Sequence, residues 1–156
     1  MSYKGRYKPQ NPQKYKGDPT NIIYRSLWEL KFCRYVDTHP DFVEWSSEEV
    51  IVPYLSPVDN KKHRYFPDFI VKKKNKDGTH STFMIEIKPH GQTVEPVFGS
   101  KGSTQKNGKP TRKFIKEATT YEINKSKWIA ARALCESRGW KFMIMTEYEL
   151  GIRKRK

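Results

Sequence analysis

The sequence predicts an α/β fold with a mixed central β-sheet flanked by helices, in the order α-β-β-β-α-β. Two observations support this prediction. Strand-like apolar segments lie on both sides of a strong hairpin signal, and helical patterns occur before and after this group of strands. A chain of 156 residues is long enough for one compact domain with a modest core.

Two helices are expected from their end signals. Ser26 and Glu29 form the S-x-x-E pattern of a capping box, and the helical spacing that follows stops at Pro40. Asn124 is a plausible N-cap for the second helix, which is expected to end at Gly139. Both helices are long enough to cover one face of a sheet.

Three of the four expected strands lie between these helices, and the fourth follows the second helix. Pro53 has no backbone N–H and therefore indicates an edge position for the first strand. The segment Asn75-Lys76-Asp77-Gly78 is a hairpin signal between the second and third strands. The four strands are expected at residues 50–54, 64–73, 81–88 and 140–146.

The length of the hairpin loop decides which residues face each other. A two-residue loop at Asp77-Gly78 would place Asp68 opposite Ile87, whereas a three-residue loop with Gly78 in the left-handed conformation places Asp68 opposite Glu86. Opposed Cβ atoms lie about 4.5–5.5 Å apart. In the second register, the two carboxylates could therefore share one cation.

The charge balance points to a polyanionic partner. Lys and Arg number 31 and Asp and Glu 17, which gives a net charge of +14. Such an excess favours nucleic acid as the partner, and a merely soluble basic protein is the alternative. No apolar run approaches the roughly 18 residues of a membrane span, and the N-terminus lacks the apolar core of a signal peptide. We therefore expect an intracellular protein without membrane contact.

The expected domain spans residues 19–150. Basic segments are expected before it, after it and in a loop within it. Residues 1–18 are expected to form a flexible basic arm, because they hold too little apolar surface to order themselves. Residues 90–113 are expected to form a basic loop, and residues 151–156 a basic tail. The alternative for the arm is an inert tail.

Three charged residues interrupt apolar strand segments, at Asp68, Glu86 and Lys88. Two close carboxylates repel each other unless one is protonated or a cation lies between them. Hard oxygen ligands select Mg²⁺ or Mn²⁺, and such an ion with an adjacent lysine suits phosphodiester hydrolysis. The alternative is a structural ion-pair cluster on the sheet.

Pro67-Asp68 followed by Glu86-Ile87-Lys88 resembles the signature of the PD-(D/E)XK (restriction-endonuclease-like) superfamily, over about residues 24–148. The resemblance implies that Asp68, Glu86 and the carbonyl of Ile87 bind the metal and that Lys88 is the catalytic lysine. It also implies that Glu29 completes the acidic site, although a capping-box glutamate needs no metal.

Together with Ser26 and Glu29 on the preceding helix and Asn124 and Lys127 on the following one, these segments are similar to the head completion nucleases of tailed bacteriophages and to the endonuclease subunit of heteromeric transposases. The length of the chain favours the phage family. This resemblance implies a DNA nuclease that acts when a filled head is joined to its tail, with trimming of packaged DNA as one role. The implied partners are double-stranded DNA and portal, neck or head proteins. The implied location is the host cytoplasm during assembly, or the virion.

Other readings stay open alongside this one. They are a transposase-type or repair endonuclease and a non-catalytic DNA-binding protein of the head-tail joint. Oligomeric state also stays open. Each of these readings retains DNA as a partner.

Basic residues outside the strands are expected to contact DNA phosphates with little sequence specificity. Three aromatic residues of the arm, Tyr3, Tyr7 and Tyr15, could stack on unpaired bases. Lys127 could reach a phosphate from the second helix, and a solvated lysine is its alternative. The expected DNA-binding residues are Lys101, Lys106, Lys109, Arg112, Lys113 and Lys127.

Overall fold

The central sheet has the strand order β3-β6-β7-β8 in the computed structural model, which describes residues 3–155. Its strands are Phe42–Ser47, Phe69–Lys74, His80–Ile87 and Lys141–Met145. Strand β6 is antiparallel to β3 and β7, whereas β8 runs parallel to β7. The predicted mixed sheet is therefore confirmed.

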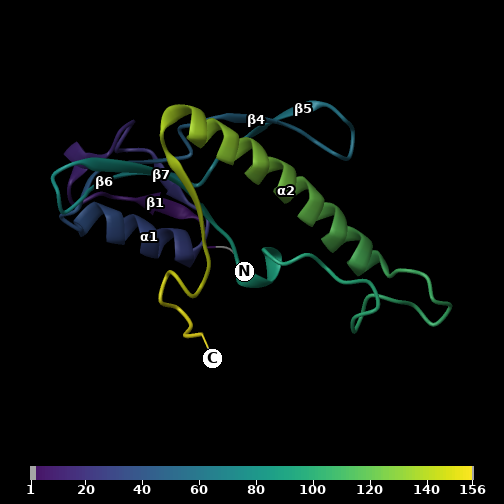
Figure 1. Cartoon of the computed structure of the whole chain (residues 1–156). Coiled ribbons are helices and arrows are strands. Elements are labelled where there is room, and N and C mark those ends of the chain that lie inside the picture. Colours follow the sequence, from purple (N-terminus) through teal and green to yellow (C-terminus); the bar gives the residue numbers. More distant parts are fainter. Residues whose placement is uncertain (1–2, 156) are drawn as a thin grey trace.

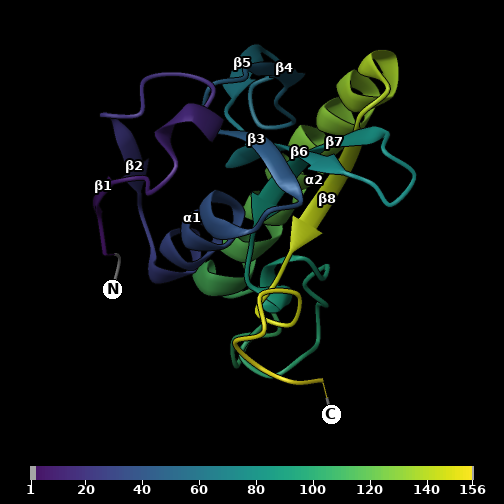
Figure 2. The ribbon, with the colours of Figure 1, turned by 90° about the vertical axis from the view of Figure 1, so that its left-hand side faces the viewer.

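Helices α1 (Leu27–Thr38) and α2 (Arg112–Arg138) lie on opposite sides of this sheet, as Figure 1 and Figure 2 show. Phe32 and Val36 of α1 pack with Phe69 and Ile85 on one face. On the other face, Ala131 and Cys135 of α2 pack with Met84. This alternation along β7 places Glu86, two residues after Met84, on the side of α2.

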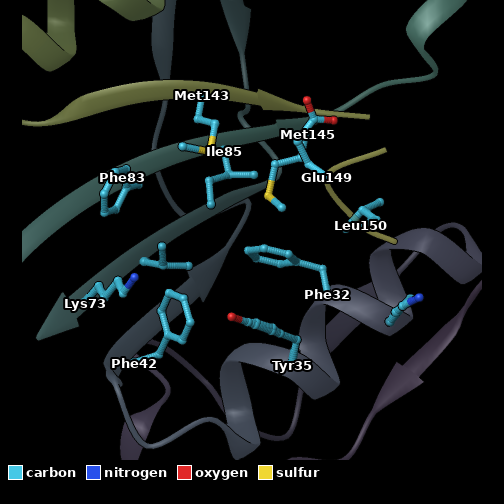
Figure 3. Close-up of a pocket in the computed structure, with 12 residues that line it drawn as sticks. Phe32, Tyr35, Phe42, Lys73, Phe83, Ile85, Met143, Met145, Glu149 and Leu150 are labelled. Atoms are coloured by element: carbon cyan, nitrogen blue, oxygen red, sulfur yellow. The ribbon is translucent and has the colours of Figure 1, made fainter. Parts of the chain in front are cut away.

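An apolar hollow of about 330 Å³ lies on the α1 side of the sheet. Figure 3 shows Phe32 of α1 and Phe83, Ile85 and Met143 of the sheet lining it. Its lining extends from Phe42 of β3 and Val71 of β6 to Met145 of β8. Among the described residues, no helix has the length and apolar character that crossing a membrane requires.

The strand predicted at residues 50–54 requires a correction. The first strand of the central sheet is β3, and β4 (Val52–Leu55) instead pairs with β5 (Lys62–Tyr65) in a separate hairpin. Strand β4 packs against α2, with Val52 and Tyr54 buried. The sequence pattern of β3 is obscured by a register shift between Phe42 and Glu44, which breaks its alternation.

The strand predicted at residues 64–73 corresponds to the end of one strand and nearly the whole of the next. Strand β5 ends at Tyr65 and β6 begins at Phe69. Pro67 lies between them, where it removes a ladder hydrogen-bond donor. Asp68 therefore stands at the start of β6, outside the regular ladder.

The hairpin register is confirmed in its three-residue form. The Asn75 amide donates to the Thr79 carbonyl at 2.7 Å, and Gly78 has φ +88° in the loop between them. Phe69 pairs with Ile85 in the ladder. Continuing this register by one residue places Asp68 opposite Glu86.

The second helix begins earlier than predicted. Its N-cap is Thr111, whose Oγ1 accepts a hydrogen bond from the Phe114 amide at 3.1 Å, and Asn124 is a buried residue inside the helix. The first half of α2 extends beyond the sheet (Figure 1), and the buried residues of this helix begin only at Asn124. The predicted end is confirmed, since Gly139 is the C-cap with φ +70°.

The expected mobile arm also requires a correction, because residues 3–18 pack on the domain. Strand β1 (Gly5–Tyr7) pairs with β2 (Ile22–Tyr24). The Tyr7 hydroxyl and the Gln10 amide donate to the buried carboxylate of Asp37, at 2.6 and 2.7 Å. The low apolar content of residues 1–18 suggested a flexible segment. The segment is ordered because the buried Asp37 carboxylate accepts its hydrogen bonds and its aromatic side chains pack on the domain.

The terminal segments also contact the domain through aromatic and charged side chains. Tyr7 and Tyr15 are buried and therefore unavailable for stacking on bases, whereas Tyr3 is exposed. In the tail, Arg155 donates to Glu149 at 3.3 Å and lies over the Tyr148 ring. Residues 1, 2 and 156 lie outside the described residues.

Candidate active site

Asp68 and Glu86 come together where β6 begins and β7 ends. Asp68 Oδ2 accepts a hydrogen bond from the Ile87 amide at 2.7 Å. This bond and the ladder register bring the aspartate beside the strand that carries Glu86. Glu86 is buried, with 6% of its surface exposed. The structure therefore brings together the two acids that the hairpin arithmetic predicted as neighbours.

Lys88 follows directly after β7 and stays beside the acids. Its backbone amide donates to the Met145 carbonyl at 3.0 Å, which extends the contact with β8 by one residue. Its Nζ lies 3.6 Å from Glu86 Oε1. Ile87, between the two, lines the same pocket. All the residues of the Glu86-Ile87-Lys88 segment therefore border one site.

Glu29 reaches this site from the first turn of α1. Its amide donates to Ser26 Oγ at 3.1 Å, so the predicted cap is present. Its own carboxylate accepts from the Arg25 amide at 2.8 Å, one residue before the position that a capping box uses. The side chain is buried, yet it borders the pocket with Asp68. The capping role and the place at the acidic site are therefore compatible.

Glu48 is an acid of this site that the sequence analysis missed. It follows β3 directly, and its amide donates to the Asp68 carbonyl at 3.1 Å. Its φ of +54° is uncommon for a residue other than glycine. Ligand oxygens of Glu29, Glu48 and Asp68 all lie within 4.8 Å of one another. No motif marks Glu48 in the sequence, because its place depends on where β3 ends.

Burial controls the charge of these acids. Desolvation raises the pKa of Asp68 well above its usual range, and the nearby Glu86 carboxylate raises it further. Burial also raises the pKa of Glu29 and of Glu86. For Glu86, the hydrogen bond from Tyr65 and the charge of Lys88 oppose this effect. Glu86 and Glu29 therefore disfavour the charged form of Asp68, and a cation beside these acids would favour it.

This donor set fits a hard divalent cation. Carboxylate oxygens are ligands that Mg²⁺ and Mn²⁺ prefer. The oxygens that lie close enough together to hold the ion belong to Asp68, Glu29 and Glu48. Glu86 and Ile87 border the same pocket and could provide further oxygens. Arg25 forms an ion pair with Glu48 at the rim. The surrounding pocket is open and has a volume of about 620 Å³, enough to admit a phosphate group beside the acids.

The predicted DNA-binding residues fall into two groups. Lys101, Lys106 and Lys109 are exposed in the loop before α2, and Arg112 and Lys113 are exposed in the first turn of α2 rather than in the loop. Lys127 is different. It is partly buried, and its Nζ lies 5.6 Å from the centre of the Tyr65 ring.

Comparison with known proteins supports a nuclease. The family model described as TnsA-like endonuclease N terminal matches residues 39–147. The chain belongs to the TnsA-like endonuclease family. It is also 40% identical over 147 residues to the head completion nuclease of Enterobacteria phage T4, a match that covers 94% of this chain and 93% of that protein.

The match to the TnsA-like endonuclease family includes most of the site. Its residues run from the end of α1 through β8, so they contain Glu48, Asp68, Glu86 and Lys88. Glu29 lies before the matched residues, although the structure places it against the same pocket. The similarity to the phage protein, by contrast, extends over nearly the whole chain. The predicted family resemblance is therefore confirmed.

Proposed function

We propose that this chain is a Mg²⁺- or Mn²⁺-dependent deoxyribonuclease that cleaves double-stranded DNA during phage head completion. One observation carries the proposal. The Asp68 carboxylate accepts a hydrogen bond from Ile87, the residue after Glu86, Lys88 lies 3.6 Å from Glu86, and Asp68, Glu86 and Lys88 border one open pocket. Because the chain belongs to an endonuclease family, we assign phosphodiester cleavage to this group of residues.

Each residue then has a distinct role. Asp68, Glu86, Glu29 and the Ile87 carbonyl would hold the ion, which would supply water activation and charge stabilisation on the phosphate oxygens. Lys88 provides a positive charge where negative charge grows on the phosphate during the displacement. Glu48 adds a carboxylate to the same cluster.

Binding of the DNA backbone is assigned to the basic surface beyond the pocket. Lys101, Lys106 and Lys109 are exposed, and Arg112 and Lys113 continue this surface onto α2. Contacts of lysine and arginine with phosphate carry no base information. We therefore expect cleavage with little sequence specificity.

The biological setting follows from the T4 relative. That protein is a head completion nuclease, and the two chains match over nearly their full lengths. We assign the same stage to this chain, with portal, neck or head proteins as partners. The host cytoplasm during assembly is then its location, or the virion, and trimming of packaged DNA is one use of its activity.

Cleavage of plasmid DNA tests this function. Linear and circular plasmids are incubated with purified protein in Mg²⁺ or EDTA, and with the Asp68→Ala and Lys88→Ala variants. Asp41→Ala and Lys76→Ala serve as matched controls, because both residues are exposed outside the pocket. We expect cleavage only in Mg²⁺, retained by the controls and lost in both site variants. Equal cleavage by the Asp68→Ala protein would refute the proposed site.

A complementation assay separates the enzyme from a structural protein of the same fold. Phage lacking this protein are supplied with the wild-type or the Asp68→Ala form, and infectious particles are counted. An enzymatic role predicts rescue by the wild type alone. Equal rescue by both forms would instead favour the non-catalytic alternative.

A further inference from the structure

Tyr65 makes a contact with the acidic site that the proposed roles do not use. Its hydroxyl donates a hydrogen bond to Glu86 Oε2, while Glu86 Oε1 faces Lys88 at 3.6 Å. The two carboxylate oxygens of Glu86 therefore have different partners. Because each oxygen has its own contact, the rotation of this carboxylate is restricted.

The tyrosine ring is itself held in place. Tyr65 is 5% exposed and packs in the cluster formed by Val52, Met84 and Ala131. Lys127 Nζ lies 5.6 Å from its ring centre, a cation–π distance. The sheet, the β4–β5 hairpin and α2 thus all fix the hydroxyl that contacts Glu86.

We propose that Tyr65 is a positioning residue, which orients the Glu86 carboxylate toward Lys88 and the ion-binding pocket. This inference rests on the proposed function. Groups that hydrogen-bond to metal-binding side chains orient them, and removing such a group commonly lowers metal affinity or activity by about 10–100-fold. Tyr65 ends β5, so the β4–β5 hairpin is the element that brings this contact to the site.

Tyr65→Phe tests the inference because it removes only the hydroxyl and keeps the ring. Tyr54→Phe is the matched control. Tyr54 is buried in the same cluster, and its ring centre lies 5.7 Å from Lys127 Nζ. Among residues 3–155, its hydroxyl forms no hydrogen bond with Glu86. For each protein, Mn²⁺ affinity is measured without DNA by electron paramagnetic resonance. The kcat and KM for DNA cleavage and the Tm are measured in parallel.

We expect Tyr65→Phe to lower kcat or Mn²⁺ affinity by about tenfold or more, with the Tm and the KM for DNA unchanged. Tyr54→Phe should match the wild type in every readout. The inference is overturned if Tyr65→Phe has wild-type or higher values of both kcat and Mn²⁺ affinity. It is also overturned if kcat or Mn²⁺ affinity falls only together with the Tm. If the wild type binds Mn²⁺ but does not cleave DNA, the cleavage proposal fails while Mn²⁺ affinity still decides the role of Tyr65. If the wild type does neither, both proposals fail.

Discussion

The carboxylate of Asp68 accepts a hydrogen bond from the backbone amide of Ile87, with 2.7 Å between Oδ2 and the amide nitrogen. This bond joins the start of β6 to the end of β7, where Glu86 and Lys88 stand. The carboxylate of Asp68 is thus held by a backbone donor of β7. A change of strand register by one residue would separate the acids.

Removing the Asp68 charge is expected to stabilise the metal-free protein at high pH. Because burial raises the pKa of Asp68, its contribution to stability is present below the unfolded pKa and is lost as pH rises through the folded value. Asp68→Asn should therefore raise the Tm in EDTA at pH 8, by about 2–4 °C for each kcal/mol gained. Differential scanning calorimetry measures this change.

Two controls accompany that measurement. At pH 4 the wild type and Asp68→Asn should melt at nearly the same temperature, since the Asp68 carboxyl is then largely protonated. Mg²⁺ at pH 8 should raise the Tm of the wild type more than that of the variant. A lower Tm of Asp68→Asn in EDTA at pH 8 would contradict the electrostatic account.

Glu48→Gly is expected to separate stability from function. Glycine adopts the φ of +54° without the steric cost that a glutamate meets, so the free energy of unfolding should stay constant or rise by up to about 1 kcal/mol. Mn²⁺ affinity and cleavage should fall, because a carboxylate of the cluster is lost. Urea unfolding and a Mn²⁺ titration measure the two effects.

Asn60→Gly is the matched control for Glu48→Gly. Asn60 has a similar φ of +57° and does not line the acidic pocket. Its replacement should leave cleavage at the wild-type rate. If Glu48→Gly also cleaved at that rate, Glu48 would have no role in the site.

Loss of the Asp37 carboxylate is expected to release the N-terminal segment. Asp37 is fully buried and accepts hydrogen bonds from Tyr7, Gln10 and Asn11. Asp37→Ala leaves these donors without their acceptor, which should cost roughly 3 kcal/mol of unfolding free energy. Urea unfolding gives this value, and limited proteolysis should show faster cleavage within residues 3–18. Asp41→Ala is the exposed control, and equal proteolysis of both variants would refute the proposed anchor.

The basic loop is expected to set the salt dependence of DNA binding. Each lysine that contacts a phosphate contributes about −0.9 to the slope of log K against log salt concentration. Lys101→Gln/Lys106→Gln should make the slope less steep, as measured by fluorescence anisotropy with a catalytically inactive background. Lys74→Gln/Lys76→Gln removes the same charge from the far end of the β6–β7 hairpin and should change the slope less. Equal effects of the two pairs would indicate a diffuse charge effect.

The sequence predicted the features that depend on local chemistry. Gly78 and its neighbours marked the hairpin and limited it to two registers, and the structure has the three-residue loop of the register that brings Asp68 toward Glu86. Ser26 and Gly139 marked helix ends through their caps. In each case the decisive interaction lies within a few residues of the chain.

Features that depend on distant contacts were not predictable. Glu48 joins the site only because β3 ends beside Asp68. Helix α2 begins well before Asn124, the first of its buried residues. The N-terminal segment is ordered by the buried Asp37, which is separated from Tyr7 by 30 positions. Such contacts require knowledge of which elements meet in space.

Diffraction from crystals grown with Mn²⁺ tests the central claim most directly. The anomalous signal of manganese locates the ion independently of any assumption about its ligands. We expect a peak within coordination distance of an Asp68 oxygen and of at least one other acid of the pocket, at about 2.0–2.2 Å. A protein that cleaves DNA while its manganese peak lies away from Asp68, or that shows no peak at saturating Mn²⁺, would contradict the account.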